Sequence, residues 1–262
     1  MKSGVTYMSY DVFQCKVISK KEIAPNIIDV VVMCRELAAE AKPGQFLHIK
    51  CGDEISMPLR RPISICDVID DKVRFIFQIK GRGTEALASL EDTLDILGPA
   101  GNSFYIDNAS FRHPAVIGGG IGTYPLLYLA KKLENPQIFL GFRTKELVTL
   151  EHDFKEISTD VTIATDDGSY GYNGFAIELL EQKMKQENFD IIYSCGPAPM
   201  LKAVKQLAEA NGIRCQLSLE ERMGCGIGAC LTCSCETTSS GTWKYKRVCK
   251  NGPVFWSDEV VL

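Results

Sequence analysis

The sequence predicts an antiparallel β-barrel, then an α/β doubly wound parallel sheet, then a small cysteine-rich segment. Three observations predict this order. Short segments rich in Val, Ile and Phe fill the first part of the chain, and strands alternate with amphipathic helices in the second. Five of the 11 cysteines crowd into the last part. The length of 262 residues is typical of about two domains, and we place the boundaries at 1–107, 108–215 and 216–262.

The first region reads as strands at 12–23, 26–34, 44–52 and 72–81. Each segment is rich in β-branched or aromatic residues, and Pro, Gly, Asn or Asp separates one from the next. Strands that are so short and so closely spaced favour a small closed barrel.

The second region changes its hydrophobic period. Apolar strand-like segments occupy 113–122, 137–142, 160–168 and 189–196, whereas 123–133, 174–187 and 199–212 have helical spacing. Alternation of buried-type strands with helices predicts a parallel sheet with helices on both faces. Residues 216–262 show little regular pattern.

Composition excludes several classes of function. The formal net charge is -4 and no long basic run is present, so nucleic acid and anionic membranes are not expected partners. The first fourteen residues lack the apolar core of a signal peptide, and no stretch reaches 18 apolar residues. We therefore expect a cytoplasmic protein whose cysteines serve a metal or redox site rather than disulfides. Six cysteines that stand singly are expected to be small buried hydrophobes: Cys15, Cys34, Cys51, Cys66, Cys195 and Cys215.

The cysteine-rich segment carries the most specific motif. Cys225, Cys230 and Cys233 are spaced C-x4-C-x2-C, and Cys249 follows after fifteen intervening residues. This spacing is typical of the ligands of a plant-type 2Fe-2S cluster. Cys235 leaves one choice open, because it could replace Cys233 as the third ligand.

Three glycines in the same loop support a compact inorganic core. Gly224, Gly226 and Gly228 allow the backbone to curl and let N–H groups approach the sulfur atoms. The alternative is a structural zinc site. Zinc ribbons usually show two C-x2-C knuckles, and this chain has one, so the cluster is favoured.

Two motifs in the first region could bind a pyrophosphate. The sequence RRPIS at 60–64 offers a guanidinium fork and a hydroxyl group, although an exposed arginine pair on a barrel strand is usually only solvated. The sequence GRGTEAL at 81–87 could begin a helix that faces a phosphate, with Thr84 as N-cap. Taken alone, it reads more simply as a turn and a helix cap.

Two turns in the second region lie where an α/β sheet receives ligands. VIGGGIGTYPLL at 116–127 runs from a strand through a glycine turn into a helix. Its glycines give G-x-G-x-G, so the dinucleotide fingerprint G-x-G-x-x-G is not met. SCGPAPM at 194–200 forms another such turn, where Cys195 could equally be a packed thiol.

Taken in order, these motifs carry a resemblance. RPIS, GRGT, GGGIG and CGP, together with PGQFLHI, LGPAGNSF and TDDGSYG, resemble the ferredoxin–NADP reductase superfamily. EERMGCGIGACLTCSC at 220–235, with VCKNGPVF at 248–255, is similar to the electron-transfer subunits of the B-type, NAD-dependent dihydroorotate dehydrogenases. The resemblance runs from about Phe13 to Leu262.

The resemblance implies three cofactor sites. The residues that would hold FAD, its pyrophosphate included, are Arg61, Pro62, Ile63, Ser64, Phe77, Gln78, Ile79, Gly83 and Thr84. The residues that would border the nicotinamide of NAD are Gly119, Gly120, Gly122, Cys195, Gly196 and Pro197. The residues that would bind the 2Fe-2S cluster are Cys225, Cys230, Cys233 and Cys249.

The resemblance also implies a function in pyrimidine biosynthesis. A partner subunit would oxidise dihydroorotate on its own FMN, and electrons would pass through the 2Fe-2S cluster and FAD of this chain to NAD+. Two copies of each subunit would form a heterotetramer, and this chain needs no acid–base catalytic residue. Arg143 follows the strand at 137–142, but no second basic residue paired with an aromatic one stands beside it, so NAD is preferred over NADP.

Three other functions stay open from the sequence. The chain could be an electron-transfer subunit of the same fold that serves a hydrogenase, a sulfide-type reductase or a transhydrogenase. It could be a stand-alone NAD(P)H reductase for a ferredoxin-like carrier. It could also be a zinc-stabilised binding module without redox function.

Overall fold

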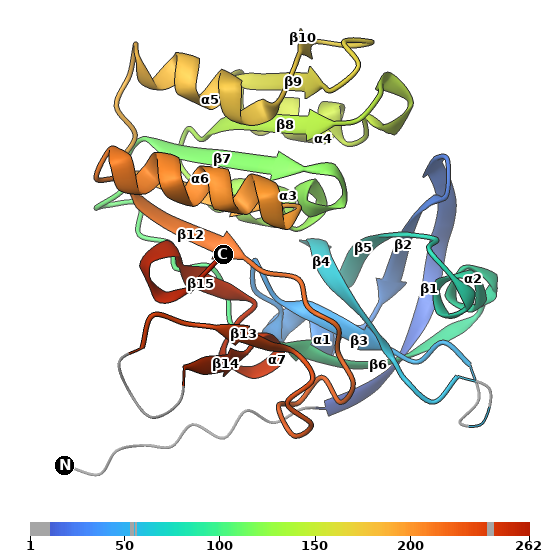
Figure 1. Cartoon of the computed structure of the whole chain (residues 1–262). Helices are drawn as coiled ribbons and strands as arrows, with labels where there is room; N and C mark the ends of the chain where they lie inside the picture. Colours follow the sequence, from blue (N-terminus) through green and yellow to red (C-terminus); the bar gives the residue numbers. More distant parts are fainter. Residues whose placement is uncertain (1–10, 53–54, 56, 240–243) are drawn as a thin grey trace.

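The computed structural model describes residues 11–52, 55, 57–239 and 244–262. A β-barrel and a β-sheet with helices on its faces make up most of the molecule, and Figure 1 shows the sheet above the barrel. The C-terminal segment lies beside the barrel and below the sheet. Among the described residues, no helix is both long enough and apolar enough to cross a lipid bilayer.

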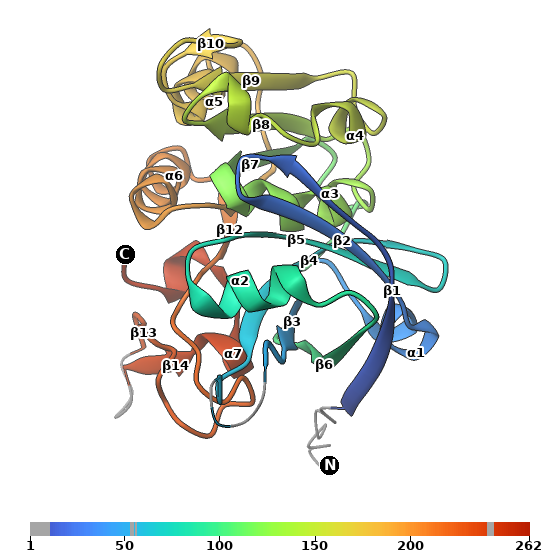
Figure 2. The ribbon, with the colours of Figure 1, turned by 90° about the vertical axis from the view of Figure 1, so that its right-hand side faces the viewer.

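Six antiparallel strands close the barrel in the order β1-β2-β5-β4-β3-β6. Their bounds are β1 Asp11–Ala24, β2 Ile27–Met33, β3 Phe46–Ile49, β4 Arg61–Ile69, β5 Lys72–Gln78 and β6 Thr93–Ala100. Leu47, Ile49, Ile65 and Phe75 point into a common core, as alternation along the strands requires. Helices α1, Arg35–Glu40, and α2, Arg82–Ser89, pack against this core through Leu37 and Leu87, and Figure 2 shows α2 in front of the barrel.

The sheet has seven strands in the order β10-β9-β8-β7-β11-β12-β15. The six parallel strands are β7 Pro114–Gly119, β8 Gln137–Phe142, β9 Val161–Thr165, β10 Tyr172–Asn173, β11 Ile191–Cys195 and β12 Arg214–Ser218. All residues of β7 and β11 are buried, because helices cover both faces of the sheet. Helices α5, Ala176–Met184, and α6, Ala198–Ala210, cover one face, and α3, Tyr124–Ala130, and α4, Glu151–Lys155, cover the other (Figure 2).

The predicted fold class of barrel, doubly wound sheet and small C-terminal segment is confirmed. The C-terminal segment has more regular structure than its sequence pattern indicates. It contains β13, Ser234–Glu236, β14, Tyr245–Arg247, α7, Val248–Asn251, and β15, Val254–Trp256. Strand β15 pairs antiparallel with β12 and becomes the edge of the sheet, so the sheet is not purely parallel.

The boundary that we expected between 215 and 216 falls inside β12. The division into domains at 1–107, 108–215 and 216–262 stays a prediction. The six single cysteines are all buried, as expected.

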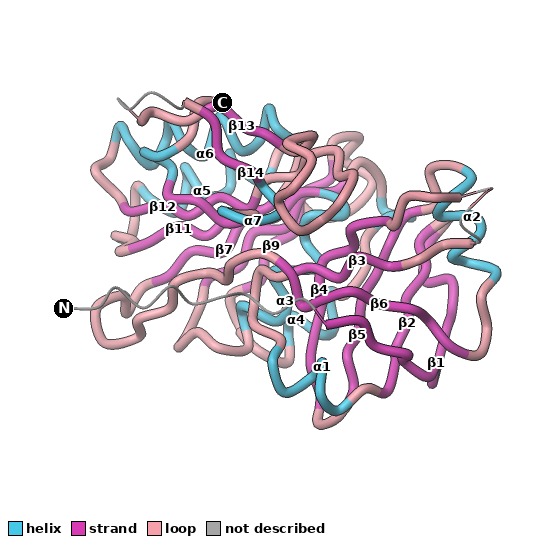
Figure 3. Tube along the Cα trace, turned by 90° about the horizontal axis from the view of Figure 1, so that it is seen from below, coloured by secondary structure: helices cyan, strands magenta, loops and turns pink. Residues whose placement is uncertain are grey.

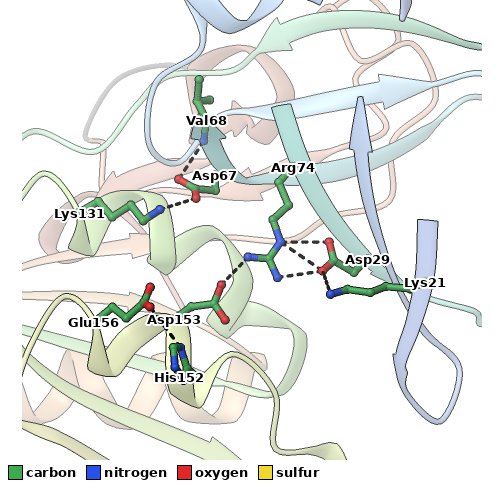
Figure 4. A network of polar contacts seen from close by, with 9 residues as sticks. All are labelled: Lys21, Asp29, Asp67, Val68, Arg74, Lys131, His152, Asp153 and Glu156. Carbon is green, nitrogen blue, oxygen red and sulfur yellow. Dashed lines mark hydrogen bonds and ion pairs between the residues drawn. The ribbon is translucent and has the colours of Figure 1, made fainter. Parts of the chain in front are cut away.

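Ion pairs connect the barrel with α4 and with the residue that follows α3, on one face of the sheet (Figure 4). The guanidinium of Arg74, on β5, contacts both carboxylate oxygens of Asp29 on β2, the closer at 2.8 Å, and Asp153 on α4 at 2.5 Å. Lys131, which follows α3, lies 2.5 Å from Asp67 on β4. These contacts hold the barrel and the α/β layer in one arrangement.

Candidate functional site

A cavity of about 230 Å³ lies where β4 and β5 of the barrel face the α/β layer. Most of the residues predicted to hold FAD line it, namely Arg61, Pro62, Ile63, Ser64, Phe77, Gln78 and Thr84. The first four residues of β4 are half-buried and all line this cavity. Two are apolar, Pro62 and Ile63, and two are polar, Arg61 and Ser64. Ile79 does not line the cavity and packs against the barrel core.

Arg61 also reaches a smaller cavity of about 210 Å³ at the start of α2, where Gly83 lies. A Cβ atom on Gly83 would stand 2.4 Å from Nε of Arg61, so a larger residue would displace the guanidinium from this position. The predicted cap is corrected. Gly81 is the N-cap of α2, and Thr84 is its third residue, whose hydroxyl group accepts hydrogen bonds from the N–H groups of Lys80 and Gly81.

A second cavity of about 550 Å³ lies above the carboxyl ends of β7, β8 and β11. Five of the six residues predicted for the nicotinamide line it: Gly119, Gly120, Gly122, Gly196 and Pro197. Cys195 stands behind this wall. It is 2% exposed, and burial raises the pKa of its thiol. A Cβ on Gly122 would lie 2.5 Å from the carbonyl oxygen of Cys195, so glycine lets the two turns meet.

The two cavities adjoin, because they share five lining residues: Gln78, Lys80, Ile121, Tyr124 and Glu220. Of these five, only Gln78 was assigned a cofactor role from the sequence. Ile121 and Tyr124 lie in the glycine-turn motif at 116–127 and Glu220 begins the cysteine motif at 220–235, but no spacing in the sequence marks these two motifs and Lys80 as neighbours. The Glu220 side chain is solvent accessible within this recess, but the protein around it raises the pKa of its carboxyl group, while Lys80 opposes that rise.

The cysteine loop places its sulfur atoms in two pairs. The N–H groups of Ala229 and Cys230 donate to Sγ of Cys225 at 3.2 and 3.4 Å, and the N–H of Cys225 donates to Sγ of Cys230 at 3.4 Å. The N–H of Cys249 donates to Sγ of Cys233 at 3.4 Å. Such N–H donors are the groups that accompany thiolates bound to a cluster. Figure 3 shows this loop beside α7 and β14.

The two pairs differ in their surroundings. Hydrogen bonds from Thr232, by its hydroxyl and its N–H, and from Cys225 lower the pKa of the Cys230 thiol to about 6. Burial, followed by the contact with Cys233, raises the pKa of the Cys249 thiol to about 12. A bound metal would keep the thiols of Cys233 and Cys249 deprotonated despite their burial.

The donor set fits a 2Fe-2S cluster better than a single zinc ion. Two pairs of thiols match the two iron atoms of such a cluster, whereas zinc requires its ligands around one point. Over the ranges that the structure describes, no three His, Cys, Asp or Glu side chains are grouped closely enough to hold one ion. Cys235 lies in β13, is 8% exposed, and packs in the core that includes Phe255.

His48 is a residue of this region that the sequence did not single out. It lies on β3, is 1% exposed, and neither ring nitrogen has a hydrogen-bond partner among the described residues. Burial, assisted by the positive charge of Arg60, lowers the pKa of its imidazole to about 4. The sequence signal was slight, because an isolated histidine in an apolar strand is more often a core residue.

Comparisons with known proteins agree with this geometry. Residues 220–261 match the family described as the iron-sulfur cluster binding domain of dihydroorotate dehydrogenase B. Among solved structures, one reported under the heading of an NADH-dependent reduced ferredoxin-NADP oxidoreductase has a TM-score of 0.83 at 28% identity, and covers 94% of this chain and 89% of its own. A ferredoxin NADP+ reductase from Neisseria gonorrhoeae has a TM-score of 0.65 at 15% identity over 77% and 92%, which shows a shared fold.

Curated relatives match almost the whole chain. The electron transfer subunit of dihydroorotate dehydrogenase B (NAD(+)) from Caldanaerobacter subterraneus is 37% identical, over 95% of this chain and 98% of its own length. The protein of the same name from a Geobacillus species is 42% identical over the same shares, and that from Bacillus mycoides is 41% identical over 94% and 97%. The chain therefore belongs to the family of electron transfer subunits of dihydroorotate dehydrogenase B.

Proposed function

We propose that this chain carries electrons from a partner subunit that oxidises dihydroorotate to NAD+, by way of a 2Fe-2S cluster and FAD. One observation carries the proposal. The segment 218–223 contributes Ser218, Glu220 and Met223 to the cavity walls, and the first cysteine of the cluster loop follows two residues later. One short stretch of chain therefore lines both cavities, through Glu220, and leads directly into the proposed cluster loop.

The residues around the flavin-side cavity suit FAD. Arg61 would pair with a phosphate through two N–H groups, and Gly83 keeps the space for that guanidinium. Phe77 and Ile63 offer apolar surface to a flat ring, and Gln78 stands where the two cavities meet. When bound, FAD exchanges single electrons as well as a hydride, which is the chemistry needed between a cluster and a nicotinamide.

The larger cavity would receive NAD. Gly119, Gly120 and Gly122 bring bare backbone to its wall, and Gly196 with Pro197 lies directly against them in the same wall. Cys195 would act behind that wall, where its buried neutral thiol packs the turn. Arg143 also lines the cavity, from the end of β8.

The partner would dock over the cluster loop. Cys230 is exposed, and two apolar side chains next to it in the loop are also exposed, Ile227 by 39% and Leu231 by 52%. A protein–protein interface would cover exposed apolar groups of this kind beside a redox site. We propose that the partner holds FMN, that two copies of each chain assemble, and that residues 1–107, 108–215 and 216–262 serve as flavin, nicotinamide and cluster units.

An electron-transfer assay tests this proposal. The isolated chain should oxidise NADH with an artificial dye and should not oxidise dihydroorotate. Addition of the FMN-bearing subunit should produce orotate with reduction of NAD+. Cys249→Ser should abolish that coupled reaction, because it removes one of the cluster ligands.

Cys215→Ser is the matched control, because Cys215 is an equally buried thiol that lies on β12, outside the cysteine loop. It should keep the coupled rate. Dihydroorotate turnover by the isolated chain, or unimpaired coupling in Cys249→Ser, would contradict the proposal.

The similarity to the NADH-dependent ferredoxin-NADP oxidoreductase structure favours a second candidate, an electron-transfer subunit with a different redox partner. Identification of the subunit that co-purifies with the chain separates the two. An FMN protein that binds dihydroorotate supports the first, and a ferredoxin-dependent subunit supports the second.

A further inference from the structure

His48 stands on the outer face of a barrel strand. Leu47 and Ile49 point into the barrel core, so alternation along β3 turns Phe46 and His48 to the other side. Phe46 packs in the core shared with the C-terminal segment. Pairing between β3 and β4 sets His48 opposite Pro62, one of the residues that line the flavin-side cavity.

The imidazole of His48 contacts the cluster loop. A Cβ atom on Gly226 would lie 2.3 Å from Nδ1 and 2.8 Å from Cε1 of His48. Gly226 also has a φ of +71°, in the left-handed region that favours glycine. Both this backbone conformation and the nearby His48 ring therefore disfavour any other residue at position 226. Gly226 directly follows Cys225, which we assign as a cluster ligand. His48 therefore joins the strand beside the flavin cavity to the loop that carries the cysteines.

The contact with Gly226 does not by itself require the polar ring of a histidine. A phenyl ring or an isobutyl group would fill the same space without the cost of burying two nitrogen atoms that lack hydrogen-bond partners within the described chain. A neutral imidazole has one N–H donor. The ring is neutral at neutral pH, since burial and the positive charge of Arg60 disfavour its protonation and outweigh the backbone carbonyl of Arg60, which favours it. A buried donor of this kind calls for an acceptor, and none of the described residues supplies one in hydrogen-bond geometry.

We propose that His48 donates an N–H hydrogen bond to a sulfur atom of the cluster and is a positioning residue that raises the cluster's reduction potential. The inference rests on the proposed function, because it requires the cluster. Reduction adds negative charge to the cluster and its sulfur atoms, so a donor stabilises the reduced form more than the oxidised form. The same bond would fix the cluster loop against β3.

A spectroscopic measurement on the unaltered protein tests the proposal first. The full chain, purified with its catalytic subunit, would be prepared with histidine labelled with 15N in the ring only, and the reduced cluster would be examined by pulsed electron paramagnetic resonance. The sequence has 3 histidines, and the other two, His113 and His152, are exposed. We expect a 15N coupling that disappears in His48→Gln and persists in His113→Gln.

Measurement of the midpoint potential is the second test. His48→Leu removes the donor and keeps most of the bulk, so its cluster should become about tenfold harder to reduce, which is about 59 mV for one electron. His48→Gln keeps an N–H donor and should recover much of the potential. His113→Gln should leave the potential unchanged.

The outcomes separate the inference from the function on which it rests. If the unaltered protein has no cluster signal, the proposed function fails. If the cluster is present, but ring-labelled histidine gives no coupling or His48→Leu keeps the unaltered potential, the proposal for His48 is wrong. If His48→Leu loses its iron, the labelling result on the unaltered protein alone decides.

Discussion

At the scale of single residues, sequence and structure differ in what each reveals. The four cysteines assigned as ligands could be predicted because three of them lie within nine residues and their spacing is characteristic. Glu220, Lys80 and His48 could not be predicted, since their roles depend on neighbours that are distant in the sequence. Thr84 was placed in the right turn, but with the wrong role as N-cap, because a hydroxyl at the third helical position can also reach back to the chain.

The choice between Cys233 and Cys235 leads to a prediction. Cys233 accepts a hydrogen bond from the N–H of Cys249, whereas Cys235 lies two residues further along and belongs to the β13–β14 ladder opposite Lys246. Two residues of extended chain span about 6.6 Å, too far for both sulfur atoms to serve one position. We expect Cys233→Ser to lose most of its iron and Cys235→Ser to keep it.

Iron and acid-labile sulfide, measured per chain after anaerobic purification, check this prediction. Cys235→Ser buries a hydroxyl group in an apolar core and should cost about 1–2 kcal/mol of stability while the iron remains. Retention of iron by Cys233→Ser together with loss from Cys235→Ser would exchange the two assignments.

At the scale of elements, the hydrophobic period decided what could be predicted. The helices and buried strands between 113 and 212 follow a clear alternation, and the structure contains them. The elements not predicted include β4, β6, β10, β12, β15, α1 and α4. Strand β4 begins with Arg61 and Pro62, and its half-buried residues face a cavity, so its pattern lacks the apolar alternation of a core strand. Strand β15 has three residues and depends on pairing with β12.

Arg74 on β5 allows a prediction about how elements are held together. It binds the carboxylate of Asp29, which is 3% exposed, and reaches Asp153 on α4, which is 33% exposed. Among the described residues, loss of the arginine leaves the buried Asp29 charge with Lys21 as its remaining ion-pair partner, at 4.0 Å. Arg74→Met should therefore lower the free energy of unfolding by about 3 kcal/mol, and Asp153→Asn by about 0.5 kcal/mol.

Urea denaturation of the chain, followed by circular dichroism, provides the comparison. Lys155→Met is the matched control, because Lys155 pairs with Glu151 at an exposed position and its loss should leave the stability almost unchanged. Equal losses in Arg74→Met and Asp153→Asn would mean that the contact between β5 and α4, rather than the buried charge of Asp29, provides the stability.

At the scale of the whole molecule, the arrangement of the parts matters more than any single motif. The barrel supplies Arg61 to Ser64, the sheet supplies the glycine turns, and the C-terminal segment supplies both Glu220 and the cysteine loop. Each glycine or arginine motif alone was a weak predictor of a cofactor site. Their order along the chain is what resembled the ferredoxin–NADP reductase superfamily. That the two cavities share five residues could not be predicted, because it depends on how the barrel and the sheet pack together.

The most direct test of the account is an anaerobic titration of the purified chain with NADH, followed by absorption and electron paramagnetic resonance. The account predicts about two iron atoms and about one FAD per chain, and reduction of both the flavin and the cluster by NADH. A chain that contains one zinc atom and no flavin would contradict it. So would a cluster that dithionite reduces but NADH does not, since the adjoining sites would then not be connected.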